Sequence, residues 1–246
     1  MNSHSMKRLL HRGIAAAASM ACAASLSGAL LVETHRSNPG ALIPDGIGTG
    51  LRDDLQVGHS AITSIQYLVV RATIDGEYNG DLYVYIQHDT GLTVLINRPG
   101  RTADNPYCYG DPGLNITLSD AAPHDIHLYQ DHATLGIGSR LEGVWQPDGR
   151  RIDPDLVLDS SPRDFLLDQF IGLDPRGQWT LFAADLERGG INRLESWELE
   201  IGGVVPEPAA TALVASLVSA LAILCRRRRH PVRMRRAYRF EYRRTL

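Results

Sequence analysis

The stretch Asp81-Leu82-Tyr83-Val84-Tyr85-Ile86 (residues 81–86) sets the fold class, because its aliphatic side chains occupy every second position. In an extended strand, this alternation places them all on one face. The turn Asp89-Thr90-Gly91 follows, and residues 92–96 return as a second apolar run. Two β-prone runs joined by a short turn that contains glycine are typical of a β-hairpin. The centre of the chain is therefore predicted to be β-structure.

Outside this hairpin, the sequence contains four more β-prone segments, at residues 62–74, 115–118, 179–182 and 196–201. Between residues 40 and 204 no long amphipathic helix is evident, and turns rich in Gly, Pro and Asp separate the runs. This pattern predicts one all-β domain over residues 43–203, a β-sandwich or jelly roll of the galactose-binding-like type, after a linker at residues 30–42. Trp179 and Trp197 are expected in its core.

Four motifs spread along this domain carry a resemblance to one family. They are Tyr78-x-Gly80-Asp81-Leu82, Ser119-Asp120-Ala121-Ala122, Gly177-x-Trp179-Thr180-Leu181 and Trp197-x-Leu199. In this order they resemble the P domain (Homo B domain), which follows the catalytic domain in proprotein convertases and other subtilisin-like serine proteases. The resemblance implies a β-sandwich with an accessory role, in a family that often binds structural calcium.

One segment, residues 189–194, departs from the pattern of that family. The family has Gly-Asp-x-Gly-x-Leu, whereas this chain has Gly-Gly-Ile-Asn-Arg-Leu. Gly190 thus replaces an aspartate that could serve as a ligand or a cap. Asn192 replaces a glycine, and asparagine can take the left-handed backbone conformation that the glycine supplies.

Three carboxylates beside turns, Asp81, Asp120 and Asp185, are the candidate calcium ligands. The chain has a net charge of −3; the residues after Cys225 carry +9 and the first 29 carry +3, so the body between them carries −15. Such a body is compatible with calcium, which prefers oxygen ligands, and it argues against a nucleic-acid partner. Capping of turns is the structural alternative for these carboxylates.

The sequence contains no motif of a hydrolase, since both Gly-x-Ser-x-Gly and His-Glu-x-x-His are missing. A non-enzyme is therefore expected, with three roles open. The first is a binding or structural module of a cell surface or exopolysaccharide matrix. The second is an accessory domain that docks on or stabilises a separate subtilisin-like serine endopeptidase. The third is a carbohydrate-binding module. Aromatic side chains exposed on one sheet face would favour sugar, and a hydrophobic face would favour docking.

The C-terminal tail has three parts in a fixed order. Val205-Pro206-Glu207-Pro208 precedes an uncharged run at residues 209–225, and Arg226-Arg227-Arg228-Arg229 follows it. At about 1.5 Å per residue, the run is at the lower end of the lengths that span a bilayer as a transmembrane helix. The arginines are expected to act as a membrane stop, with residues 226–246 as a basic cytoplasmic tail. The arrangement resembles the PEP-CTERM sorting signal, which implies cleavage by an exosortase; a plain anchor is the alternative.

The N-terminus has the features of a signal peptide over residues 1–29. Lys7, Arg8 and Arg12 are basic, and the apolar stretch at residues 13–26 is too short to be a spanning helix. Together the two ends predict export by the Sec machinery, an inner-membrane anchor before processing, and a final place at the cell surface or in the extracellular matrix. The expected partners are an exosortase, the membrane before processing, and an exopolysaccharide or surface protein.

Overall fold

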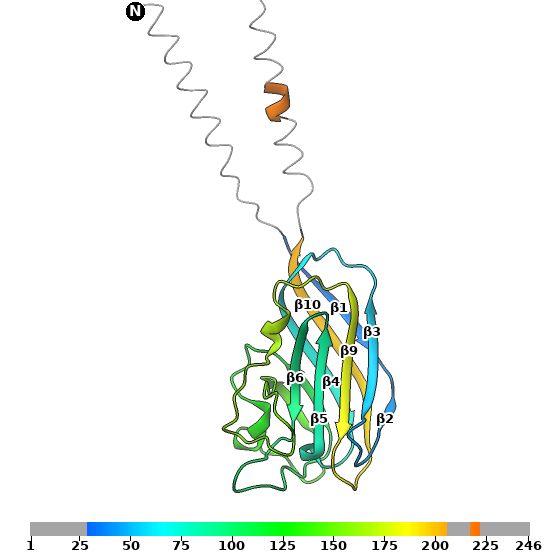
Figure 1. The fold of residues 1–246 in the computed structure, drawn as a ribbon, viewed down its shortest axis with the longest axis vertical. Coiled ribbons are helices and arrows are strands. Elements are labelled where there is room, and N and C mark those ends of the chain that lie inside the picture. Colours follow the sequence, from blue (N-terminus) through cyan, green and yellow to red (C-terminus); the bar gives the residue numbers. More distant parts are fainter. Residues whose placement is uncertain (1–28, 206–216, 222–246) are drawn as a thin grey trace, which may run out of the picture. The chain divides into compact units, whose positions relative to one another are not determined.

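The structure is a computed structural model that describes residues 29–205 and 217–221 (Figure 1). Residues Gly28–Pro206 form one compact unit. Its ten strands are β1 (Ala29–Ser37), β2 (Ala41–Ile43), β3 (Leu51–Val57), β4 (Ser64–Asp75), β5 (Leu82–His88), β6 (Gly91–Asn97), β7 (Leu114–Leu118), β8 (Leu141–Trp145), β9 (Gly177–Asp185) and β10 (Asn192–Val205). Three short 3-10 helices are η2 (Asn79–Asp81), η3 (Ile126–Asp131) and η4 (Leu167–Phe170). The all-β prediction is confirmed.

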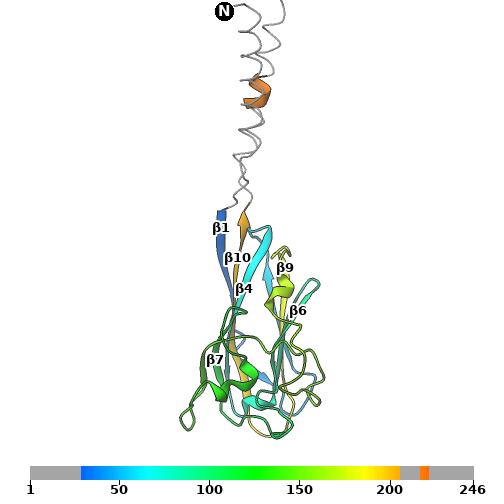
Figure 2. The ribbon, with the colours of Figure 1, turned by 90° about the vertical axis from the view of Figure 1, so that its left-hand side faces the viewer.

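The strands form two sheets. The six-stranded sheet has the order β1-β10-β4-β7-β8, with β2 also paired to β10, and the four-stranded sheet has the order β3-β9-β5-β6. β7 and β8 run parallel, whereas the two long central strands β4 and β10 run antiparallel. Figure 2 shows the two sheets from the side, as two layers. The jelly-roll, galactose-binding-like type of this arrangement stays a prediction.

The predicted hairpin at residues 81–96 is the pair β5 and β6, whose register runs from His88↔Gly91 to Tyr83↔Asn97. The burial of the side chains alternates along β5. Leu82, Val84 and Ile86 are at most 1% exposed, whereas the tyrosines between them are only partly buried. The aliphatic side chains therefore face the core, and the tyrosines lie on the outer face of the four-stranded sheet.

One apolar core lies between the sheets and draws on both of them, as Leu199 of β10 and Leu181 of β9 illustrate. Trp179 is 0% exposed and Trp197 is 1% exposed. The indole Nε1 of Trp197 donates a hydrogen bond to Asp53 Oδ2 at 2.6 Å. Because Trp197 belongs to β10 and Asp53 to β3, this bond joins the two sheets through the edge of the core.

Residues 30–42, expected as a linker, instead form most of β1 and β2. β1 pairs with β10 over its whole length, from Ala29↔Val205 to Ser37↔Trp197. Without β1, this edge of β10 would leave a row of backbone N–H and C=O groups without partners. The strand is hard to recognise in the sequence because its outer face is exposed, with Leu30 at 63% and Val32 at 46%.

Several predictions concern residues outside the described ones: the signal peptide up to residue 28, Pro206-Glu207-Pro208, and Arg226–Arg229. Within the predicted transmembrane run, residues 217–221 are described and are helical. In the described part of the chain, no helix is long and apolar enough to cross a membrane. This finding corrects the predicted inner-membrane anchor, and the localisation that depended on it, at the cell surface or in the matrix after processing, is not retained.

We predict that Trp179→Ala and Trp197→Ala each lower the free energy of unfolding by about 3–5 kcal/mol, because truncation of a buried tryptophan leaves a cavity. The measurement is chemical denaturation of Gly28–Pro206, which contains the buried core residues of the described chain, from Ile43 to Ile201. Tyr107→Ala is the control, because Tyr107 is 89% exposed; its effect should stay within about 0.5 kcal/mol. Unchanged stability in both tryptophan variants would contradict this core.

Candidate functional site

Strands β5 and β9 bring Asp81 and Asp185 together at one end of the four-stranded sheet. Asp81 ends η2 just before β5, and Asp185 ends β9 opposite Leu82. The two segments are also joined through the backbone, since the N–H of Leu186 donates to the carbonyl of Asp81 at 2.9 Å. With Asp45 and Glu187 from the adjoining loops, these residues form a group of four carboxylates that we call the acidic end.

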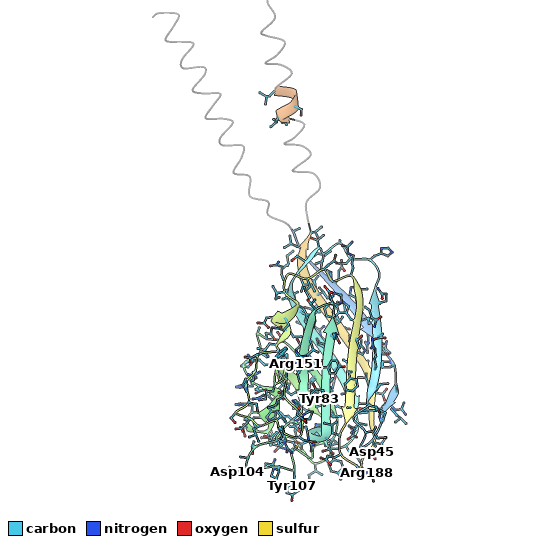
Figure 3. The ribbon with its side chains drawn as sticks, in the orientation of Figure 1. Asp45, Tyr83, Asp104, Tyr107, Arg151 and Arg188 are labelled. Carbon is cyan, nitrogen blue, oxygen red and sulfur yellow. The ribbon has the colours of Figure 1, made fainter. Side chains whose placement is uncertain are left out.

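The loop that carries Asp45 packs against the loop between β9 and β10. The N–H of Gly189 donates to Asp45 Oδ1 at 3.0 Å. Gly46 lies so close to Arg188 that a Cβ at this position would come within 2.5 Å of its Cγ. Figure 3 shows Asp45 and Arg188 near each other at this end of the domain. The acidic end is therefore held by two loops as well as by the two strands.

At the acidic end, burial and neighbouring negative charges disfavour the ionised forms of Asp81 and Asp185. Burial raises the pKa of Asp81 to about 6; the charge of Arg98 opposes this shift, and the nearby carboxylates of Asp185, Glu187 and Asp45 add to it. Burial also raises the pKa of Asp185.

The two oxygens of Asp185 have different environments. Asn192 Nδ2 donates to Asp185 Oδ2 at 2.7 Å, whereas Oδ1 is buried with no hydrogen-bond partner in the described chain. Asp185 itself is 0% exposed. One fully buried carboxylate oxygen of Asp185 thus makes no regular hydrogen bond, although the backbone N–H of Glu187 offsets part of the effect of burial on the pKa of this group.

The guanidinium of Arg98 is the cation of the acidic end. Its side chain is 4% exposed, and its nitrogens lie 2.8 Å from Glu187, 3.5 Å from Asp155 and 3.9 Å from Asp81. Its Nε also donates to the carbonyl of Gly80 at 3.3 Å. The buried positive charge therefore binds η2, the β9–β10 loop and the long loop after β8 to the end of β6.

Arg98 itself (φ 47°) adopts the left-handed backbone conformation, and so do two nearby residues other than glycine, Tyr78 (φ 53°) and Cys108 (φ 62°). Such conformations are rare for residues with a Cβ and persist only where the surroundings hold them. Gly80 explains part of the crowding, because a Cβ there would come within 2.3 Å of Cys108 Cβ. These backbone conformations accompany the burial of the Arg98 side chain, which is 4% exposed.

Asp120 is not part of the acidic end. Its two carboxylate oxygens accept the backbone N–H groups of Leu167, at 3.0 Å, and Asp168, at 2.8 Å. These residues begin η4, so Asp120 satisfies the free N–H groups at the start of that helix. The capping alternative therefore describes Asp120, and the three predicted calcium ligands do not form one site.

The acidic end does not fit a calcium ion as the resemblance implies. In the described residues no group of three or more His, Cys, Asp or Glu side chains is placed to hold a metal ion. Two of the predicted ligands, Asp81 and Asp185, do adjoin, and the free Oδ1 of Asp185 is the one observation in favour of a cation. Arg98, however, already supplies a positive charge among these carboxylates, within 3.9 Å of Asp81.

Asn192 has a role that the sequence did not predict. It does not adopt the left-handed conformation; Gly189 and Gly190 do, with φ of 110° and 90°. Asn192 instead starts β10 and bridges two segments, because its Oδ1 accepts the N–H of Glu77 at 3.1 Å while its Nδ2 binds Asp185. Gly76 leaves room for this bridge, since a Cβ there would come within 1.9 Å of Asn192 Oδ1.

The buried histidine His127 has no nitrogen free for catalysis. Its Nδ1 lies 2.8 Å from Asp148 Oδ2, and its Nε2 lies 2.9 Å from the carbonyl oxygen of Arg101. In a catalytic triad, the second nitrogen would instead face a nucleophile. Burial alone would lower the pKa of His127, but the hydrogen bond and the charge of Asp148 outweigh it and raise this pKa. The pair therefore serves the structure of the 125–150 region.

No family model matches the chain, and no curated protein matches it. Among solved structures, it is similar to a serine protease from Aeromonas sobria in complex with its chaperone ORF2, at 15% identity and a TM-score of 0.42 over 76% of this chain and 29% of that chain. It is also similar to the serine protease of Aeromonas sobria, at 14% identity and a TM-score of 0.39 over 75% of this chain and 29% of that chain. This chain thus spans less than a third of each of those chains.

We predict that Asp81 makes the domain less stable as the pH rises from about 4 to about 6. Because the pKa of Asp81 is raised to about 6 in the folded state, from an ordinary value of about 3.9, the folded protein holds this proton more tightly than the unfolded chain. The free energy of unfolding should therefore fall more steeply over this range in the wild type than in Asp81→Asn, which has no proton to lose. Parallel curves from urea denaturation at each pH would contradict the raised pKa.

We also predict that calcium and magnesium stabilise the domain to the same extent, because Arg98 lies among the carboxylates and only screening of the acidic body remains. The measurement is the melting temperature of the wild type and of Asp185→Asn in matched millimolar concentrations of each ion. A calcium-specific increase in the wild type that disappears in Asp185→Asn would show that a calcium ion binds at the acidic end after all.

Proposed function

We propose that this chain is a non-catalytic accessory module of the P-domain kind, and that it acts by associating with a subtilisin-like serine protease. The observation that carries the proposal is the meeting of its separate sequence motifs. The first motif ends in Leu82 of β5, and the motif Gly177-x-Trp179-Thr180-Leu181 begins β9; about 100 residues separate them in sequence, yet β5 and β9 are paired neighbours, from Leu82↔Asp185 to His88↔Trp179. Motifs that interlock in this way act as one signature of a fold.

The state of the polar groups supports a binding role over a hydrolytic one. Both nitrogens of His127 face oxygen atoms, and so do those of His88, at 2.9 Å from the carbonyl oxygen of Gln178 and 2.7 Å from that of Asp174. His88 is also stacked on Trp179, with 4.1 Å between the ring centroids. A histidine that acts as a general base needs a ring nitrogen that can reach substrate or nucleophile. These two histidines serve the packing of the domain.

The experiment is affinity capture from the source organism with Gly28–Pro206 as bait, followed by mass spectrometry and then by work with the purified pair. A subtilisin-like protease should be enriched over the same capture with Trp197→Ala, whose fold is weakened. At a domain concentration of ten times Kd, thermal inactivation of that protease should slow about tenfold if the domain binds only its folded state. The domain alone should hydrolyse neither casein nor peptide substrates.

Two outcomes would overturn the proposal. The first is hydrolysis by the purified domain that a serine-directed inhibitor stops. The second is a captured protease that loses activity at the same rate with and without the folded domain.

A further inference from the structure

The outer face of the four-stranded sheet carries a row of aromatic side chains that the core does not use. Tyr83 and Tyr85 of β5 point outward, and Phe182 of β9 lies directly opposite Tyr85 in the register. We call these three residues the aromatic face. All three are partly exposed, and Figure 3 shows Tyr83 on this face of the sheet.

The three rings lie close enough together to act as one surface. The rings of Tyr85 and Phe182 are stacked, with centroids 4.9 Å apart and an interplanar angle of 18°. The centroids of Tyr83 and Tyr85 are 6.0 Å apart. Gly50 gives Phe182 its place, because a Cβ at residue 50 would come within 2.5 Å of the Phe182 ring. The rings are therefore held in fixed positions before any partner arrives.

A row of polar side chains runs across the sheet beside the aromatic face. Asp54, Thr180 and Gln87 are cross-strand partners on β3, β9 and β5, two residues along each strand from the aromatic row. Thr180 Oγ1 donates to Asp54 Oδ1 at 2.6 Å, and Arg52 Nε lies 3.0 Å from the same oxygen. Hydrogen-bonding groups thus stand at a fixed distance from the rings.

The long loop after β8 forms the other side of the aromatic face. Asn97 Nδ2 donates to the carbonyls of Arg150, at 2.9 Å, and Ile152, at 3.1 Å, and so fixes this loop on the edge strand β6. Arg151 is exposed, and its guanidinium carbon lies 4.8 Å from the centroid of the Phe165 ring. Arg151 is close enough to Tyr83 for its charge to oppose the rise that burial causes in the pKa of Tyr83, and both residues are labelled in Figure 3. The rings therefore lie between a polar row and a fixed loop.

Stacking across the strands explains the rings of Tyr85 and Phe182, but no contact within the fold explains the hydroxyl groups of the two tyrosines. Within the described residues, neither the hydroxyl of Tyr83 nor that of Tyr85 has a hydrogen-bond partner, whereas Tyr67, on the outer face of the other sheet, donates to Glu200 at 3.4 Å. That other face is charged, since Arg71 also pairs with Glu198 and Glu200 at 2.8 and 2.7 Å. Partly exposed aromatic rings with free hydroxyls are typical of a binding surface.

We propose that the aromatic face binds a neutral polysaccharide, whose pyranose rings lie on Tyr83, Tyr85 and Phe182. The charges beside the face favour this partner: Arg52 and Asp54 neutralise each other 3.0 Å apart, Arg151 is stacked on the Phe165 ring, and the acidic body repels polyanions. A sugar ring presents C–H groups on one side and hydroxyls at its rim. The C–H groups fit the aromatic rings, and the hydroxyls reach the polar row of Asp54, Thr180 and Gln87.

This ligand goes beyond the proposed association with a protease and does not rest on it. The protease would be recognised by some other part of the surface, and the sugar by the aromatic face. A module with both properties would hold a protease on a polysaccharide layer. Each property can fail without the other, because one is measured with purified glycans and the other with a purified protease.

The test is affinity electrophoresis of Gly28–Pro206 through native gels that contain a neutral polysaccharide: a β-glucan, a galactomannan, a xylan or a dextran. At least one should retard the wild type, and isothermal titration should then give its Kd. Tyr85→Ala should weaken this affinity about tenfold, the size of change that 1.4 kcal/mol of lost stacking produces. Tyr83→Ala is the second variant, for use if Tyr85→Ala unfolds, and thermal melts of each variant report its folding.

Tyr67→Ala is the matched control, because it removes a partly buried tyrosine from the outer face of the other sheet. It should retain wild-type affinity. Three results would overturn the proposal: no retardation by any neutral polysaccharide, equal loss in Tyr67→Ala and Tyr85→Ala, or retention only by a polyanion such as alginate that salt abolishes. Loss of protease capture in Tyr85→Ala without any sugar binding would make the aromatic face a protein-docking surface instead.

Discussion

The charge of Arg98 is the constraint on which the acidic end depends. Three segments reach its guanidinium: η2 through Gly80 and Asp81, the β9–β10 loop through Glu187, and the long loop after β8 through Asp155. The guanidinium thereby joins them to the end of β6, which Arg98 directly follows. A buried cation with this many carboxylate neighbours cannot be removed without leaving charges uncompensated. The left-handed backbone of Arg98, at φ 47°, is a local cost that the surrounding contacts offset.

The same arginine explains why calcium and the acidic end do not fit together. A calcium ion needs six to eight oxygen ligands that converge on one point. Here the oxygens of Asp81 and Glu187 turn to a planar guanidinium, and Asp185 turns one oxygen to Asn192. Asp120, the third expected ligand, holds the start of η4. Among the carboxylate oxygens of Asp81, Asp120 and Asp185, the one that is buried in the described chain without a hydrogen-bond partner is Oδ1 of Asp185.

The sequence predicts those parts of the fold in which apolar residues repeat at every second position. The hairpin of β5 and β6 follows from alternation alone, because every second residue must be apolar to face the core. β1 could not be predicted from alternation, because it is an edge strand whose outer residues, Leu30 among them, are exposed. The burial of Arg98 could not be predicted either, because Asn97-Arg98-Pro99-Gly100 has the composition of an exposed turn. Nothing in the local sequence indicates that carboxylates from distant segments surround this arginine. Asp120 could not be assigned for a related reason: a carboxylate beside a loop looks the same in sequence whether it accepts backbone N–H groups or binds a metal.

The acidic end and the aromatic face differ in what they leave available to a partner. At the acidic end, Asn192 binds one oxygen of Asp185 and Arg98 binds Glu187, and these contacts join the loops of this end to one another. The aromatic face follows from the alternation of side chains along β5. The same alternation that buries Val84 presents Tyr83 and Tyr85 to solvent. A strand with one apolar face needs only polar residues on its other face. The pair of Tyr85 and Phe182 supports the sheet across two strands, and the exposed parts of these rings also add contact area for a ligand. The outer face of the four-stranded sheet is therefore where this domain has surface to offer a ligand.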